Sequence, residues 1–151
     1  MYLISACLLG NNCKYDGGNN ESRWVVEFAK KHSYMPVCPE VSGGMTTPRH
    51  PSEIVEDGGA FKVVNNIGED VTDYFEKGAD GIIQAAEIAA MVRGERIEGA
   101  ILKQYSPSCG SGEIYDGTFT RTIVPGDGVF VRRLRELGIP VWHERCEVQP
   151  D

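Results

Sequence analysis

The 151-residue chain lacks several features that would place it in a membrane, secreted or repeat class. It has no run of about 20 apolar residues, the length that a membrane-spanning helix needs. No basic residues precede the short apolar stretch near its N-terminus, so that stretch does not resemble a secretory signal. We find no repeat, low-complexity tract or obvious linker. We therefore expect one domain over residues 1–151, in the cytoplasm and without a membrane partner.

Positive charge is also scarce. The 15 Lys and Arg residues are outnumbered by 22 Asp and Glu residues, which gives a net charge of −7. A field of this sign repels phosphate backbones, so we do not expect nucleic acid as a partner. Hydrophobic residues make up 41% and charged residues 25%, which indicates a globular domain rather than a disordered chain. A small molecule is the expected partner, and the sequence leaves the oligomeric state open.

The five cysteines form neither a disulfide framework nor the paired knuckles of a zinc site. Their number is odd, and a chain of this length buries enough surface to fold without cross-links. No Cys-x-x-Cys pair occurs, although structural zinc sites usually contain one. In a reducing compartment such cysteines bind metals, act in catalysis or fill the core. Their role therefore depends on where the fold places them.

Short apolar segments alternate with helical patterns along the chain. Four segments predict buried strands: 2–8, 34–37, 99–103 and 139–142. Three segments with helical periodicity predict helices: 21–31, 71–92 and 128–137. This order is typical of an α/β fold, here a single compact Rossmann-like domain with a small, mostly parallel sheet flanked by helices. The Gly- and Pro-rich segment 42–60 is predicted to be a long functional loop, followed by a short extension at 61–64.

Three cysteines lie in segments that leave predicted strands. Cys7, Cys38 and Cys109 follow the first, second and third strands along the chain. Ligands of parallel sheets bind beyond the carboxyl ends of the strands, so we expect these three thiols to converge. Thiolates bind zinc, copper(I) and iron–sulfur clusters. Two features favour a cluster. Pro39 lacks an N–H and fixes the chain beside Cys38, and the glycines beside Cys109 expose backbone N–H groups that can bond the cluster sulfides.

The remaining candidate groups leave alternatives open. Cys13 is a fourth ligand, a transient sulfur carrier or a lining thiol, whereas Cys146 is interpreted as a bystander. A Cys–His hydrolase would use His50, the histidine expected nearest to the strand ends, unless His50 is a solvated loop residue. Segment 7–14 resembles the phosphate loop of low-molecular-weight tyrosine phosphatases. However, Cys13 occupies the position where that loop needs an arginine.

Motifs that fall in order along nearly the whole chain resemble the domain-of-unknown-function 523 (DUF523) family, whose members include thiouracil desulfidases. The motifs include Ser5-Ala6-Cys7-Leu8-Leu9-Gly10, Pro36-Val37-Cys38-Pro39-Glu40, Thr47-Pro48-Arg49 and Ser106-Pro107-Ser108-Cys109-Gly110. The Cys-Pro-Glu and Ser-Pro-Ser-Cys-Gly motifs are specific in combination. The resemblance implies a compact α/β fold with a [4Fe-4S] cluster held by Cys7, Cys38 and Cys109. It further implies an enzyme that removes sulfur from a thiouracil-like thiocarbonyl compound by non-redox C–S hydrolysis. The substrate sulfur would bind the iron that lacks a protein ligand.

The same resemblance indicates which polar residues take part. The catalytic candidates are Glu40, which would shuttle protons, and Ser106 and Ser108, which would hold the ring or the water. The candidates for substrate lining are Asp16, Arg49 and Lys103. Glu40 could instead pair with Arg49, and the serines could only shape the turn around Pro107. A non-catalytic metal or cluster carrier would use the same cysteines, and turnover distinguishes the two functions.

Overall fold

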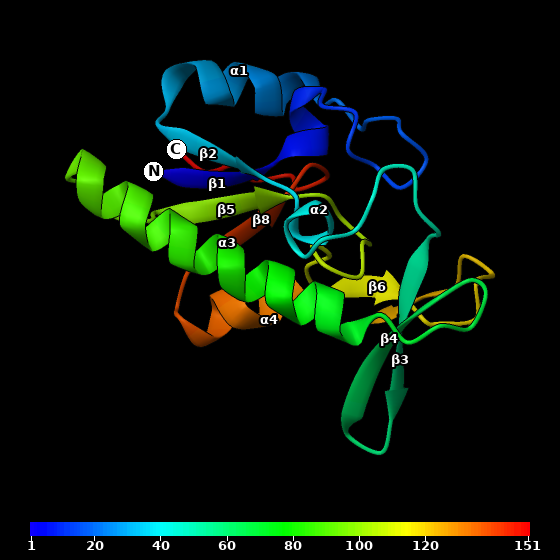
Figure 1. Ribbon diagram of the computed structural model, residues 1–151. Helices are drawn as coiled ribbons and strands as arrows, with labels where there is room; N and C mark the ends of the chain where they lie inside the picture. Colours follow the sequence, from blue (N-terminus) through cyan, green and yellow to red (C-terminus); the bar gives the residue numbers. More distant parts are fainter.

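A computed structural model describes residues 1–151, with the side chain of residue 57 left aside. Its central sheet has four strands in the order β2-β1-β5-β8 (Figure 1). They are β1 (Tyr2–Ser5), β2 (Tyr34–Val37), β5 (Gly99–Leu102) and β8 (Val141–His143). Each neighbouring pair is parallel, so the carboxyl ends of all four strands lie at one edge of the sheet. The predicted α/β fold with a small parallel sheet is confirmed.

Helices cover both faces of this sheet (Figure 1). Helix α1 (Arg23–Lys31) lies on one face, and α3 (Thr72–Arg93) and α4 (Val129–Glu136) lie on the other. Side chains alternate along β1 accordingly: Tyr2 and Ile4 join the cluster under α1, whereas Leu3 joins the cluster under α3 and α4. Among the described residues, no helix has both the length and the hydropathy needed to cross a bilayer.

The first predicted strand ends earlier than expected. After Ser5 the chain enters a 3₁₀ turn, η1 (Ala6–Leu9), which ends at Gly10 in the left-handed region with φ 92°. Glycine adopts this conformation without the steric cost of a β-carbon. The turn carries Cys7 off the end of β1 and leaves it at the edge of the sheet.

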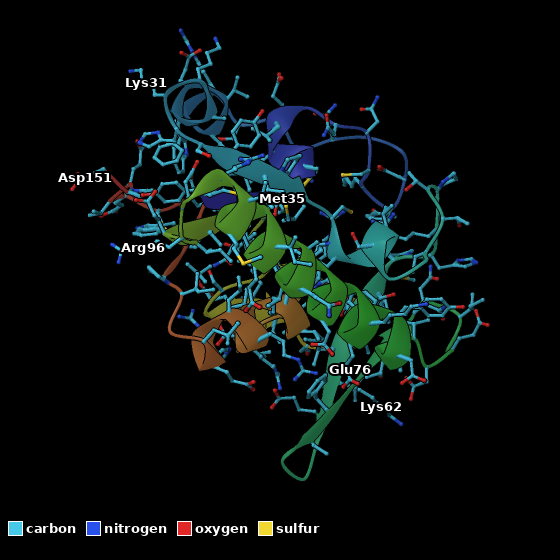
Figure 2. The ribbon with its side chains drawn as sticks, turned by 60° about the vertical axis from the view of Figure 1, so that its left-hand side comes forward. Lys31, Met35, Lys62, Glu76, Arg96 and Asp151 are labelled. Atoms are coloured by element: carbon cyan, nitrogen blue, oxygen red, sulfur yellow. The ribbon has the colours of Figure 1, made fainter. Side chains whose placement is uncertain are left out.

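The segment 42–60, predicted as a long loop, is irregular over residues 43–51 but forms a strand from Ser52, so the prediction is wrong for its second half. It begins at the end of α2 (Pro39–Ser42), and β3 (Ser52–Asp57) then pairs antiparallel with β4 (Ala60–Asn65). The core side chains Ile54 and Val63 hold this hairpin against the domain. The hairpin projects from the end of the molecule opposite α1, as Lys31 and Lys62 show in Figure 2. A second hairpin, β6 (Glu113–Tyr115) with β7 (Ile123–Pro125), was not predicted.

Helices α2 and α3 pack backbone against backbone at two glycines. A β-carbon on Gly78 of α3 would collide with the carbonyl oxygen of Pro39, and one on Gly43 would collide with the carbonyl oxygen of Tyr74. Glycine allows this close approach because it has no side chain. Since Pro39 directly follows Cys38, the contact also fixes the position of that cysteine.

Candidate functional site

A cavity of about 440 Å³ lies at the edge of the sheet where β1, β2 and β5 end. Its walls come from the segments after these strands, from residues 49–53 and from the second hairpin. Cys7, Cys13, Cys38 and Cys109 all line it. Cys146 is not among the lining residues; its sulfur accepts the backbone N–H of His143 at 3.3 Å.

The Cys13 side chain lies beside those of Cys7 and Cys38, and Cys38 Sγ is 3.9 Å from the carbonyl oxygen of Cys13. The neighbouring sulfurs share the single thiol proton of Cys13, which raises the pKa of Cys13 and lowers the pKa of Cys7. The same proton, together with the backbone N–H of Val41, lowers the pKa of Cys38 to about 7. The arrangement therefore favours thiolates at Cys7 and Cys38 and a neutral thiol at Cys13.

Cys109 lies deeper in the cavity, and only 4% of it is exposed. Burial raises the pKa of its thiol to about 12, although the Ser5 and Ser108 hydroxyls oppose that rise. The Ser108 hydroxyl donates to the sulfur of Cys109 at 3.6 Å. Without a metal to replace its proton, Cys109 is neutral at pH 7.

These differences predict how the thiols react in protein freed of metal with a chelator. Alkylation by iodoacetamide requires the thiolate, and the thiolate fraction rises with pH through the pKa. Cys38 should reach half of its maximal rate near pH 7, about two pH units below an ordinary thiol of pKa 9.0. Cys109 should remain unmodified across this range. Peptide mass spectrometry measures both sites, and a pH profile at Cys38 equal to that of free N-acetylcysteine would contradict the prediction.

Glu40 and Arg49 form an ion pair of 2.6 Å within the cavity wall. The Arg49 side chain is 5% exposed and also donates to the carbonyl oxygen of Cys13 at 2.9 Å. Further bonds reach the Thr46 carbonyl oxygen at 3.2 Å and the Thr47 hydroxyl at 3.0 Å. Arg49 therefore connects the Cys13 segment to the start of α2. The pairing of Glu40 with Arg49, which the sequence analysis gave as an alternative, is present.

The two candidate serines organise the turn that carries Cys109. Ser106 Oγ accepts the backbone N–H groups of Ser108 at 3.1 Å and Cys109 at 2.9 Å. The two hydroxyls bond to each other at 2.9 Å. Ser106 thus shapes the turn, whereas Ser108, which is 2% exposed, also reaches the cysteine sulfur.

The two remaining lining candidates are placed differently. Lys103 lines the cavity, donates to the carbonyl oxygen of Gln104 at 2.9 Å and pairs with Glu144 at 3.2 Å. Asp16 does not belong to the lining; it is exposed, accepts the N–H of Gly18 at 2.9 Å and pairs with Lys14 at 3.6 Å. None of the three histidines is a lining residue, so no Cys–His pair forms within the described cavity.

Several cavity residues were not predicted from the sequence. Glu53 of β3 is one, and the others are Tyr105, Tyr115, Phe119 and Arg121. Tyr105, Phe119 and Arg121 adopt positive φ angles of 69°, 59° and 60°, a conformation uncommon for residues other than glycine. These residues reach the cavity through an unpredicted hairpin and irregular turns. Such segments show no regular spacing of apolar residues from which they could be predicted.

The cavity differs in charge from the protein as a whole. Its lining contains two more cations than carboxylates, because four basic side chains outnumber Glu40 and Glu53 (4 − 2). The chain has a net charge of −7. A positive site in a negative protein stabilises bound anions, thiolates included. The four basic side chains are Lys14, Arg49, Lys103 and Arg121.

Comparison with known proteins gives three full-length similarities. The family profile described as 2-thiouracil desulfurase matches residues 2–145. Uncharacterized protein YbbK of Bacillus subtilis (strain 168) is 40% identical over 151 residues, which cover 95% of each chain. A solved structure described as [4Fe-4S]-dependent thiouracil desulfidase TudS (DUF523Vcz) is 39% identical, with a TM-score of 0.79. That match covers 95% of this chain and 89% of the other.

Proposed function

The chain belongs to the 2-thiouracil desulfurase family, and we propose that it is a [4Fe-4S]-dependent desulfidase acting on a thiouracil-like compound. The observation that carries the proposal is the meeting of Cys7, Cys38 and Cys109 on one cavity at the ends of parallel strands. In the proposed reaction, water replaces the thiocarbonyl sulfur. One thiocarbonyl compound and one water give one oxo compound and one hydrogen sulfide, without a change in oxidation state.

The donor set of the cavity fits an iron–sulfur cluster. Thiolates are the usual ligands of such clusters, and hydrogen bonds to their sulfurs tune the metal centre. Ser108 donates such a bond to the Cys109 sulfur at 3.6 Å, and Asn20 and the backbone of Val41 lower the pKa of Cys7 and Cys38. Within the part of the chain that the structure describes, no three His, Cys, Asp or Glu side chains could hold a single metal ion. In a cluster, by contrast, each thiolate binds a different iron.

We assign Cys7, Cys38 and Cys109 as the ligands and Cys13 as a neutral thiol beside Cys7 and Cys38. When bound on three cysteines, the cluster supplies one iron without a protein ligand, which acts as a Lewis acid toward the substrate sulfur. Lys103 contributes positive charge beside Cys7, which favours negative sulfur at this side of the cavity.

Glu40 is the proposed proton carrier. Its carboxylate lines the cavity, and Arg49 fixes one of its oxygens at 2.6 Å. Water that attacks the thiocarbonyl carbon must lose a proton, and departing sulfide must gain protons. Glu40 would accept the first proton and return it to the sulfur. Arg49 acts through Glu40 as a positioning residue. The Ser108 hydroxyl donates a hydrogen bond to the Cys109 sulfur.

Turnover of 2-thiouracil by the anaerobically reconstituted protein tests the proposal. Uracil and sulfide should form in equal amounts. Glu40→Gln should lower kcat by about 10²-fold to 10⁴-fold, the usual contribution of general acid–base catalysis. Its iron content should match that of the parent. Glu136→Gln, an exposed change on α4, is the matched control. A protein that binds the cluster yet releases no sulfide would instead support the carrier function.

A further inference from the structure

Glu53 is a buried carboxylate on the cavity wall to which the proposed function assigns no role. It is 8% exposed, and its Oε1 accepts the backbone N–H groups of Gly117 at 3.0 Å and Phe119 at 3.1 Å. Among the described residues, no cation pairs with Glu53 and no donor bonds to its Oε2. An unpaired buried carboxylate is costly, so its presence on this wall requires an explanation.

The segment that carries Glu53 has other polar atoms without partners. Arg49 Nε and Ser52 Oγ are both buried, and neither has a hydrogen-bond partner among the described residues. Both residues line the cavity together with Glu53. Buried polar atoms are nearly always satisfied in native proteins. These two unpartnered atoms, together with the Glu53 Oε2 that accepts no hydrogen bond, indicate a wall built to meet a polar ligand.

Glu53 is the strongest hydrogen-bond acceptor still available in the cavity. Glu40 is neutralised by its ion pair with Arg49. Gln104 Oε1 accepts the backbone N–H of Ser111 at 2.8 Å, and its Nε2 donates to the Ser111 carbonyl oxygen at 3.0 Å. Glu53 keeps an uncompensated charge and one free oxygen, which suits a charge-assisted bond from a ligand N–H.

We infer that Glu53 determines substrate specificity by accepting the ring N–H adjacent to the thiocarbonyl carbon. The inference rests on the proposed function and narrows its substrate class to cyclic thioamides that keep this N–H. Substitution of that nitrogen removes the donor and leaves a buried carboxylate unpaired. A site built around such a bond discriminates strongly against analogues that lack it.

Two isomeric substrates isolate this hydrogen bond. 1-Methyl-4-thiouracil keeps the N–H beside the C=S group, and 3-methyl-4-thiouracil lacks it. We expect the parent enzyme to prefer the 1-methyl isomer by roughly 10-fold to 100-fold in kcat/KM, the effect of a hydrogen bond to a charged group. The products 1-methyluracil and 3-methyluracil should bind in the same order by calorimetry, which gives a measurement independent of turnover.

Glu53→Gln changes the chemistry of the wall with little change in shape. The N–H groups of Gly117 and Phe119 should hold the glutamine carbonyl oxygen, so that its NH₂ faces the cavity. An acceptor becomes a donor, and the preference for the 1-methyl isomer should vanish. Glu56→Gln, on the same strand but exposed and paired with Arg132 at 2.9 Å, should keep the preference.

The outcomes separate the inference from the proposed function. A parent enzyme that is active but indifferent to the two isomers overturns the inference alone, whether or not the variant folds. A Glu53→Gln protein that retains the preference also overturns it and leaves Glu53 only the task of holding the 117–119 turn. A parent enzyme that is inactive on 2-thiouracil and on both isomers contradicts the proposed function, and the inference with it.

Discussion

Cys38→Ser is expected to remove the cluster and to reduce sulfide release to background. A serine hydroxyl is a poor iron ligand compared with a thiolate, and the lowered pKa of Cys38 is lost with the sulfur. Cys7→Ser and Cys109→Ser should have the same effect. Iron and sulfide analysis after anaerobic reconstitution should fall from about four of each per chain to well below one. The broad visible absorption should disappear in parallel.

Cys13→Ser and Cys146→Ser are the matched controls for this experiment. A serine at position 13 can still donate its one hydroxyl proton to the sulfur of Cys7 or Cys38, so iron should be retained. Cys146 does not line the cavity, and its replacement should leave iron and turnover unchanged. Loss of iron in Cys13→Ser as complete as in Cys38→Ser would make Cys13 a ligand. A full cluster in Cys38→Ser would refute the assigned site.

Gly78→Ala should be the most destabilising single methyl addition at the α2–α3 contact. The added β-carbon would meet the Pro39 carbonyl oxygen, and backbone atoms cannot rotate aside as a side chain can. We expect a loss of about 3 kcal/mol in the free energy of unfolding, the upper part of the usual overpacking range. Tm should fall by about 6–12 °C for a chain of this size. Urea unfolding of the metal-free protein measures the effect.

Gly81→Ala on the same helix provides the control. Its β-carbon would meet no atom within 4 Å, so only helix propensity should change. This variant should be more stable than the parent, by about 0.5–1 kcal/mol. Because α2 begins directly after Cys38, Gly78→Ala should also lower iron loading, whereas Gly81→Ala should not. Equal stability of the two variants would show that α2 can move away from α3 at little cost.

The parallel sheet could be predicted because its strands are short apolar runs between helical patterns. Leu3 and Ile4 are both buried, as expected for a strand covered on its two faces. The hairpin β3–β4 could be predicted only in part. Val63 lies in the predicted extension 61–64, whereas Ile54 lies in a segment whose Gly and Pro content is typical of a loop. The burial of both side chains depends on packing against α3 and α4, which no local pattern contains.

The cysteine site was predictable for a similar reason: parallel strands bring their carboxyl ends together. The motif resemblance to the DUF523 family is confirmed by the match over residues 2–145. The surroundings of the thiols were harder to predict from the sequence. Nothing in the sequence fixes Cys13 beside Cys7 and Cys38. Nor does it show that Asp16 is exposed and pairs with Lys14 instead of lining the cavity. Glu53 reaches the cavity only because an unpredicted hairpin forms.

The strand order has a consequence for how copies of the protein can meet. Strands β2 and β8 are the two edges of the sheet, where unpaired backbone groups could recruit a further strand. Pro36 on β2 has no N–H to offer such a strand, and β8 is only three residues long. Both edges are therefore poor templates for sheet extension. The central sheet is therefore protected against edge-to-edge aggregation.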